Sequence, residues 1–374
     1  GEIAKLIDEG YAEIAPPTSS ERLWYLPHHL VLNPKKPGKL RVVFDCAARF
    51  RGESLNDKCY QGPDLVNKLI HVLIRFRQGL YAFSCDVEAM YYQILIPPSD
   101  RDALRFLWCE NGSVVEYRMT RHLFGGVWCA SSSTYALRES VSNDDVHPQV
   151  RDVVCRSFYV DDCLHSADSA DQVVQLALDT KEVLMQHGFR LTKYISNVDD
   201  LIHALPPSEV ENADKDLDFF PSVLGVKWNV ARDLFRFTCD LEIPDFVTRR
   251  QMLSVVSSIY DPLGLLSPAT VRGKMLLQEA VRMKLPWDQP VPHELFREWK
   301  HWLNCMNQVG ELCIERCIKP WDESECALEL HHFSDASENA FGSCSYLRCV
   351  SRAGQLSVHL VMSKGKVAPV KKMT

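Results

Sequence analysis

The stretch Phe158-Tyr159-Val160-Asp161-Asp162-Cys163-Leu164 sets two adjacent carboxylates between apolar segments, as at the tip of a β-hairpin. A third carboxylate, Asp86, directly follows the apolar run 80–85, which has the composition of a strand. Phosphoryl transfer on nucleotides commonly uses two divalent ions about 4 Å apart, and Mg²⁺ prefers carboxylate oxygens. Carboxylates at the ends of two neighbouring strands would meet that need.

Adjacent aspartates are also common in ordinary turns, because Asp tolerates turn geometry. The chain has three such pairs, Asp144-Asp145, Asp161-Asp162 and Asp199-Asp200. Only the pair at 161–162 has aromatic and β-branched residues before it and apolar residues after it. From spacing alone, a simple turn and a metal site both remain open.

The chain has 374 residues, of which 46% are hydrophobic and 24% charged, and these proportions exclude a disordered or fibrous protein. This length has room for roughly two to three domains. With 42 Lys and Arg against 49 Asp and Glu, the net charge of −7 argues against a nucleic-acid binder. The charge is uneven, however, because Asp45 is the one acid among seven basic residues between positions 22 and 51, whereas acids gather at 199–218.

No apolar run approaches the roughly 18 residues that a membrane span needs. The 14 Cys are scattered through apolar runs, which predicts buried free thiols in a reducing compartment. The chain starts at Gly1 and stops abruptly at Thr374, so we expect a piece of a longer polypeptide.

Hydrophobic period and turn residues predict a mixture of helices and strands. Strands are expected at 24–26, in hairpins of 29–32 with 40–44, 104–109 with 114–119 and 153–159 with 163–164, and at 328–334, 341–350 and 356–362. Helices are expected at 3–14, 126–140, 170–187, 248–258 and 269–284, and an acidic solvated loop at 199–218. This order is typical of an α+β protein.

Tyr159-Val160-Asp161-Asp162 resembles the catalytic hairpin of reverse transcriptases, and five further motifs stand in that family's order. Asp86-Val87-Glu88-Ala89-Met90-Tyr91 is similar to the first palm motif, with its metal-binding Asp and an aromatic residue five positions later. The other similar motifs are Lys39-Leu40-Arg41-Val42-Val43-Phe44-Asp45, Phe124-Gly125-Gly126 with Ala130-Ser131, Gly188-Phe189-Arg190-Leu191-Thr192-Lys193, and Val223-Leu224-Gly225-Val226. The sequences of residues 100–108 and 258–268 most resemble those of BEL/Pao-type LTR retrotransposons.

This resemblance covers nearly the whole chain and implies the architecture of a right-hand polymerase. We expect an α+β fold with fingers and a palm that contains an antiparallel sheet over residues 1–230. A thumb or connection-like helical region would follow at 231–325, and an incomplete RNase H-like α/β domain at 326–374.

The resemblance also implies a metal site. Asp86 and Asp161 would hold two Mg²⁺ ions, with Mn²⁺ as a substitute, while Asp162 supports them and the Val87 carbonyl adds a ligand. All three carboxylates are then expected to be catalytic.

Nucleotide and primer contacts are implied in the same way. Arg41 would bind the triphosphate with one of Lys35, Lys36 and Lys39, and the sequence does not separate these three. Tyr91 would face the sugar and exclude a 2′-hydroxyl, Phe124 and Gly125 would lie near the base, and Lys193 could give a proton to pyrophosphate. The expected primer-binding residues are Tyr159, Leu224 and Gly225.

His332-Phe333-Ser334-Asp335-Ala336-Ser337 resembles the first strand of an RNase H domain, which ends in a metal-binding Asp. Because Asp335 alone cannot form a two-metal site, we expect no RNase H activity from this chain. We also expect its last 50 or so residues to be marginally stable without covering helices.

The chain is therefore expected to act as an RNA-directed DNA polymerase with an RNA or DNA template, a primer, dNTPs and other segments of its polyprotein as partners, away from membranes. Its expected location is cytoplasmic, in a virus-like particle, or nuclear. One alternative is a decayed or host-adopted relic that only binds nucleic acid. Another is a Pao-type aspartic peptidase, although the chain has no Asp-Thr/Ser-Gly triplet.

Overall fold

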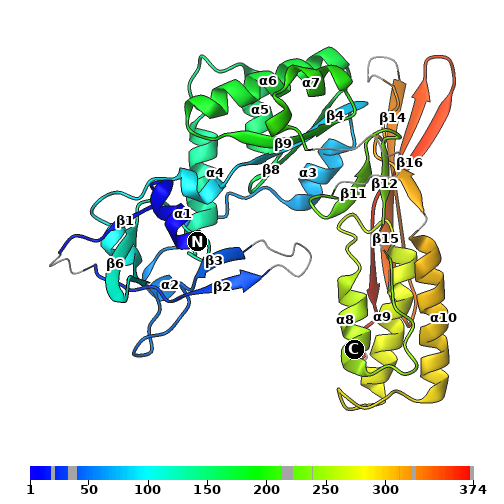
Figure 1. The fold of residues 1–374 in the computed structure, drawn as a ribbon. Coiled ribbons are helices and arrows are strands. Elements are labelled where there is room, and N and C mark those ends of the chain that lie inside the picture. The colour runs from blue at the N-terminus through cyan, green and yellow to red at the C-terminus, as the bar shows by residue number, and fades with distance from the viewer. Residues whose placement is uncertain are drawn as a thin grey trace. The chain divides into compact units, whose positions relative to one another are not determined.

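The computed structural model describes residues 1–17, 22–32, 40–211, 222–237, 239–310, 312–321 and 326–370 (Figure 1). It is a mixed α/β structure that divides into two compact units. The first comprises 1–67, 86–161 and 178–192, and the second 68–85, 162–177 and 193–374.

The first unit begins with helix α1 (Glu2–Asp8) and strand β1 (Ala12–Ile14). The predicted helix over 3–14 is wrong in its second half, because Gly10 adopts φ 71° and Ala12–Ile14 pairs antiparallel with β6. Strands β5 (Arg105–Glu110) and β6 (Ser113–Met119) form the predicted hairpin, giving the sheet order β1-β6-β5.

A second hairpin, β2 (His28–Leu32) with β3 (Leu40–Phe44), confirms another prediction. The expected strand at 24–26 is absent from the described residues apart from an isolated bridge between Tyr25 and Arg105. Phe44 packs edge-on against Phe106 with ring centroids 5.1 Å apart, and both are buried in the core of this unit.

The first unit also contains short elements around the predicted site. These are α2 (Leu55–Lys58), η1 (Met90–Gln93), η2 (Arg101–Leu104), α4 (Cys129–Glu139), α5 (Pro148–Arg156) and β7 (Phe158–Tyr159). The strand expected over 153–159 is wrong, because most of it belongs to α5. Val150, Val153 and Val154 bury one face of that helix, which starts with Pro148 in its first turn.

Strands β4 (Tyr81–Val87), β8 (Asp162–Ala167) and β9 (Leu191–Ser196) join β7 in a four-stranded sheet with the order β7-β8-β4-β9. Helix α6 (Ala170–Gln186) follows β8 and, as predicted, stops before Gly188, whose φ is 83°. The loop expected at 199–218 is wrong at its start, since α7 (Asp199–Ala204) and η3 (Pro207–Glu209) form there. Residues 212–218 lie outside the described part.

The second unit begins with α3 (Leu69–Phe76) and contains two further sheets and three long helices. One sheet has the order β10-β11-β12-β13, with β10 (Ser222–Val223), β11 (Val226–Asn229), β12 (Leu234–Arg236) and β13 (Cys313–Glu315). The other is β14 (Cys326–Ala336), β15 (Ala340–Ser351) and β16 (Leu356–Val367), which confirms the three strands predicted there.

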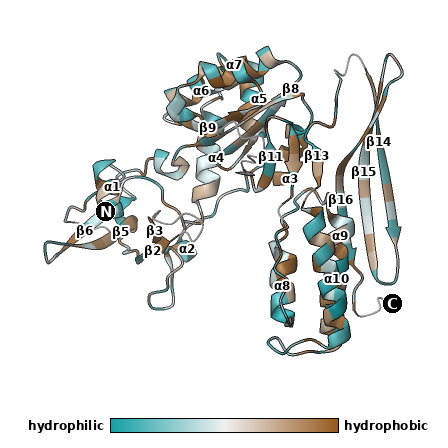
Figure 2. Cartoon of the chain, turned by 45° about the vertical axis from the view of Figure 1, so that its right-hand side comes forward, coloured by the Kyte–Doolittle hydropathy of each residue, from teal (hydrophilic) through white to brown (hydrophobic). Residues whose placement is uncertain are grey.

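Helices α8 (Arg249–Ser258) and α9 (Ser267–Arg282) match their predictions closely, and α10 (His293–Val309) was not predicted. Figure 2 shows hydrophilic and hydrophobic patches on α9 and α10, as expected for helices that bury one side. The buried side of α10 includes Trp299 and Trp302, whose rings lie 4.6 Å apart.

Within the described residues, no helix is long and apolar enough to cross a membrane. All 14 cysteines are free thiols, and half of them are buried, among them Cys85 and Cys163. The predicted buried free thiols are confirmed for these seven, whereas Cys109, Cys305 and Cys313 are exposed.

Candidate polymerase site

Two of the predicted metal-binding carboxylates come from the ends of strands joined by a backbone hydrogen bond. Asp86 is the penultimate residue of β4, and Asp161 lies in the tight turn after β7. The Val87 N–H donates to the Asp161 carbonyl oxygen at 2.8 Å. Both aspartates are partly buried, so the structure brings these two positions together in the first unit.

The turn that presents Asp161 has an unusual backbone. Val160 adopts φ 57°, in the left-handed region where a β-branched residue is strained. Such strain persists only where the surroundings impose it, and it is often found at functional sites. Asp162 follows in the chain as the first residue of β8, where the second unit resumes.

The carboxylate oxygens of Asp86 and Asp161 belong to the hard ligands that Mg²⁺ prefers, so the donor types fit this ion. Throughout the described residues, however, no three His, Cys, Asp or Glu side chains gather closely enough to hold a metal ion. Within those residues, the backbone hydrogen bond from Val87 to Asp161 brings the strand end with Asp86 to the turn with Asp161.

Tyr91 and Phe124 lie beside this pair. Their rings meet edge to face with centroids 4.6 Å apart, and Phe124 keeps 48% of its surface exposed. Burial raises the pKa of the Tyr91 phenol above its ordinary value, and the neighbouring Cys129 and Asp161 groups raise it further. Tyr91 is thus a neutral ring within electrostatic reach of Asp161.

Gly125 is required by close packing as well as by backbone conformation. Its φ is +110°, and a Cβ at this position would lie 2.8 Å from the Phe44 carbonyl oxygen. Asn56 holds the same loop, because its Nδ2 donates to the Gly125 carbonyl at 3.0 Å and its Oδ1 accepts from the Val127 N–H at 3.0 Å. Asn56 was not predicted, and no motif around it distinguishes it.

Glu88 and Arg190 also adjoin the strand ends and were not predicted as site residues. The Glu88 N–H donates to the Arg190 carbonyl oxygen at 2.9 Å, and Arg190 Nη1 donates to Glu88 Oε2 at 3.1 Å. Both residues lie inside motifs quoted from the sequence, which is the signal that could have found them.

The other predicted contact residues come from several elements. Arg41 is exposed on β3 opposite Val31, and Lys35, Lys36 and Lys39 lie outside the described residues. Tyr159 is the last residue of β7. Lys193 belongs to β9 within the second unit and has φ 55°.

Leu224 and Gly225, also in the second unit, form a two-residue turn between β10 and β11. Their φ values are 48° and 81°, which suits a tight hairpin. A Cβ on Gly225 would lie 2.7 Å from the Tyr260 ring, so this turn packs closely against that side chain.

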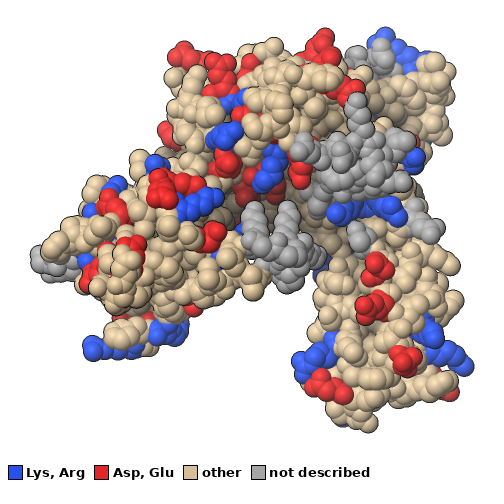
Figure 3. Space-filling model, in the orientation of Figure 1, with Lys and Arg blue, Asp and Glu red and all other residues tan. Residues whose placement is uncertain are grey.

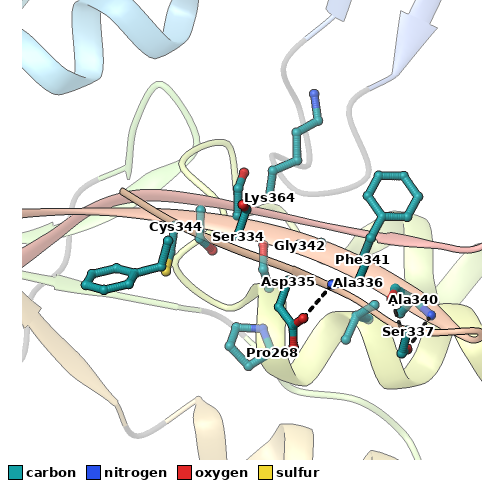
Figure 4. A pocket seen from close by; sticks show the side chains of 16 residues that line it. Pro268, Ser334, Asp335, Ala336, Ser337, Ala340, Phe341, Gly342, Cys344 and Lys364 are labelled. Carbon is teal, nitrogen blue, oxygen red and sulfur yellow. Dashed lines mark hydrogen bonds between the residues drawn. The ribbon is translucent and has the colours of Figure 1, made fainter. Parts of the chain in front are cut away.

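Asp335 lines a pocket of about 410 Å³ between the start of α9 and one end of the β14–β16 sheet. Figure 4 shows its carboxylate beside Pro268, accepting a hydrogen bond from the Ala336 N–H at 2.8 Å. Among the described residues that line the pocket, Asp335 is the only acid. Ser334, Phe333, Cys344 and Lys364 make up part of the remaining wall.

Charge is distributed without one dominant patch on the face shown in Figure 3, where acidic and basic side chains are interspersed. Several of the basic residues that the sequence concentrates between 22 and 51 fall outside the described part. On the face that Figure 3 shows, the described basic residues therefore form no continuous stripe.

The C-terminal third of the chain matches a known family model. Residues 248–374 match the family model of the Pao retrotransposon-like RNaseH-like domain. No curated protein matches the chain.

The fold as a whole resembles a retroviral reverse transcriptase. The structure of the foamy viral protease-reverse transcriptase dRH in complex with double-stranded DNA matches with a TM-score of 0.61 at 14% identity, over 98% of this chain and 54% of that one. The same enzyme with an RNA/DNA hybrid and with double-stranded DNA gives TM-scores of 0.58, also at 14% identity and 98% coverage of this chain. This chain covers 42% and 65% of those two, so it spans about half the length of the proteins it resembles.

The family match and the fold likeness together support a Pao/BEL-type Pol region. The family match confirms the Pao-type resemblance over residues 248–374, and the likeness to solved structures, at 14% identity, shows the fold alone.

Proposed function

We propose that this chain is an RNA-directed DNA polymerase, which adds deoxynucleotides to the 3′-hydroxyl of a primer on an RNA or DNA template. The observation that carries the proposal is the hydrogen bond from Val87 to Asp161, because it brings the strand end with Asp86 to the turn with Asp161. The fold likeness to a reverse transcriptase supports the same activity.

In this proposal Asp86 and Asp161 would hold two Mg²⁺ ions, and Asp162 and the Val87 carbonyl would assist them. When bound, such ions would lower the pKa of the primer hydroxyl and neutralise charge on the phosphates. The contribution of the chain is to hold the carboxylates at rigid strand ends. The strained turn at Val160 fixes the direction of Asp161.

Nucleotide selection would fall to the aromatic pair and the glycine loop. Tyr91 would contact the sugar, and the ring of Phe124 would hold it in place from the side. Gly125 would let the backbone approach the base and sugar closely. Arg41, one of the Lys residues at 35, 36 and 39, and Lys193 are proposed to contact the phosphates, and Tyr159, Leu224 and Gly225 the primer.

The proposed partners follow from the same comparison, since the similar foamy viral enzyme was solved with double-stranded DNA and with an RNA/DNA hybrid. The life cycle of an LTR retrotransposon would place the protein in a cytoplasmic virus-like particle. Free thiols on every cysteine are compatible with that reducing location.

The test is Mg²⁺-dependent extension of a DNA primer on an RNA template, with Asp161→Asn in parallel. We expect extension by the parent protein and none by the variant. Asp145→Asn is the matched control, because Asp145 is an exposed member of another Asp-Asp pair. Equal extension by Asp161→Asn and the parent would refute the site assignment.

A second candidate is a catalytically decayed relic that binds nucleic acid. The fold likeness to an enzyme solved with double-stranded DNA fits this candidate too, because binding a duplex requires no catalytic metal. Retained binding of a primer–template duplex without any extension, with either Mg²⁺ or Mn²⁺, would select the relic over the polymerase.

A further inference from the structure

Glu88 occupies the position directly after the β4 strand end and is held at three points. Its N–H donates to the Arg190 carbonyl oxygen at 2.9 Å, and its carboxylate accepts from Arg190 Nη1 at 3.1 Å. Its own carbonyl oxygen accepts from Gln93 Nε2 at 3.1 Å. Backbone and side chain of one residue are therefore both tied to Arg190.

The Arg190 side of this contact is rigid. Phe189 and Leu191, its two neighbours, are 3% and 1% exposed, so their side chains anchor the backbone in the core. The Phe189 N–H donates to the Leu184 carbonyl oxygen at 2.9 Å. Phe189 directly follows Gly188, whose left-handed backbone comes just after the end of α6. Arg190 thus projects from a fixed backbone between two buried residues.

Glu88 is followed by a short turn that ends at Tyr91, whose ring packs against Phe124. Ala89 adopts φ 50°, an uncommon conformation for a residue with a Cβ, and Met90 is buried at 2% exposure. Tyr91 follows within the short helix η1, with its ring against Phe124. A turn with this strained backbone needs its ends held, and Glu88 is one of them.

We infer that Arg190 and Glu88 form a positioning pair that sets the place of Tyr91 against the incoming sugar, so that Arg190 helps to select deoxyribonucleotides over ribonucleotides. This inference rests on the proposed polymerase function. The pair would act through the turn 88–91 and not by direct contact with the nucleotide or the metal.

The size of the effect is bounded by the exposure of the pair. The Arg190 and Glu88 side chains are 41% and 51% exposed, and ion pairs of this kind contribute little free energy. Loss of the pair should therefore change sugar discrimination by about three- to fivefold and leave the fold intact.

The test compares single-nucleotide incorporation of dTTP and UTP opposite adenine in an RNA template, as the ratio of their kcat/KM values. The variants are Glu88→Gln, Arg190→Gln, the double variant and Arg190→Lys. Arg156→Gln is the matched control, because Arg156 forms a similarly exposed ion pair with Asp152 at 2.9 Å on α5.

We expect Glu88→Gln and Arg190→Gln each to lower the dTTP/UTP ratio about three- to fivefold, and the double variant to lower it no further. Arg190→Lys, which retains the charge, should stay within about twofold of the parent, and Arg156→Gln should equal the parent. These results together would support a pair that acts as one unit.

Three results would overturn the inference while leaving the polymerase proposal intact. They are an unchanged ratio in both single variants, an additive loss in the double variant, and an equal rise of KM for both nucleotides in Arg190→Gln alone, which would indicate a direct phosphate contact. No extension by the parent protein would instead overturn the proposed function and this inference with it.

Discussion

The side chain of Arg77 binds the backbone of Arg316, 239 positions further along the chain. Its Nε donates to the Arg316 carbonyl oxygen at 3.1 Å. Arg316 in turn donates to the carbonyl oxygens of Phe76 and Gly79, on either side of Arg77. Both arginines are fully buried within the second unit. They connect the residues that enter β4 to β13.

The buried charges are well supplied with acceptors. Arg316 makes a two-point ion pair with Asp233 at 2.6 and 2.8 Å, and Arg77 reaches the Leu360 carbonyl in β16 at 2.9 Å. Burial and the nearby Arg316 charge lower the pKa of Arg77 to about 10, so it stays charged at neutral pH. The segment that leads into β4 therefore depends on contacts with Arg316 and Leu360, which lie in the part of the chain that matches the Pao family model.

Replacement of Arg316 should destabilise the protein strongly. Arg316→Met removes the ion pair to Asp233, which still accepts from Trp228 Nε1 at 2.9 Å, and the donor to the carbonyl oxygens of Phe76, Gly79 and Leu80. Breaking a buried pair costs about 3–5 kcal/mol. Urea unfolding of the full chain measures this loss. Arg348→Met is the control, because Arg348 pairs with Glu329 on the exposed sheet and should cost about 1 kcal/mol or less. Equal losses in the two variants would contradict the role given to Arg316.

Gly125→Ala should impair both stability and nucleotide binding. The new Cβ meets the Phe44 carbonyl at 2.8 Å in addition to the strain of a positive φ. Gly112→Ala is the control, since Gly112 also has a positive φ but has nothing within 4 Å of its Cβ, and should cost only about 1–2 kcal/mol. We expect a larger loss for Gly125→Ala in urea unfolding, together with a raised KM for dNTP. A smaller loss than in the control would count against close packing at this loop.

The buried side chain of His122 should make the protein less stable in mild acid. This side chain is 6% exposed, and burial lowers its pKa from 6.5 to about 4. As the pH falls from 6.5 towards 4, the unfolded chain binds a proton at His122 that the folded chain does not bind. The free energy of unfolding therefore decreases over this range. The loss attributable to His122 is about 3 kcal/mol at the acid end.

Urea unfolding at pH 7 and pH 5 tests this dependence on His122. His122→Leu should lose less stability over the interval than the parent, whereas His187→Gln, at an exposed position on the loop after α6, should behave as the parent does. An unchanged pH dependence in His122→Leu would show that other groups cause the acid loss.

Tyr91→Ala should admit ribonucleotides more readily than the parent. Removal of the ring beside Phe124 opens space where a 2′-hydroxyl would otherwise clash, whereas Tyr91→Phe keeps the ring and should keep the discrimination. The ratio of kcat/KM for dTTP and UTP is the measurement. Tyr135→Ala serves as the control, because Tyr135 is an exposed tyrosine on α4. An unchanged ratio in Tyr91→Ala would refute the steric gate.

The predictions that the structure confirms rested on local sequence patterns, such as turn residues and the spacing of apolar residues. The β5–β6 hairpin was predictable because Asn111 and Gly112 both accept the positive φ that its tight turn needs. The α5 helix was missed because a short run rich in valine fits either a strand or a buried helix face. Its valines at 150, 153 and 154 reveal the helical spacing only when the burial is known.

Contacts between distant positions could not be predicted. Neither Arg77 nor Arg316 stands in a recognisable motif, and their partners are backbone carbonyls, which any residue supplies. Glu88 and Arg190 did lie in quoted motifs, yet their pairing across 102 positions depends on how β4 and β9 lie in one sheet. The apolar runs beside Asp86 and Asp161 predicted their places at strand ends, which the structure confirms, whereas their role as Mg²⁺ ligands stays a prediction.

The most direct test of the central claim, that Asp86 and Asp161 form one catalytic site, is single-turnover incorporation of one dNTP with Mg²⁺. The variants are Asp86→Asn, Asp161→Asn and the double variant. Residues that act as one unit are strongly non-additive, so each single variant should lower the rate by at least about a thousandfold, and the double variant should be no slower than either. Rates near that of the parent in either single variant, or an additive loss in the double variant, would contradict the claim.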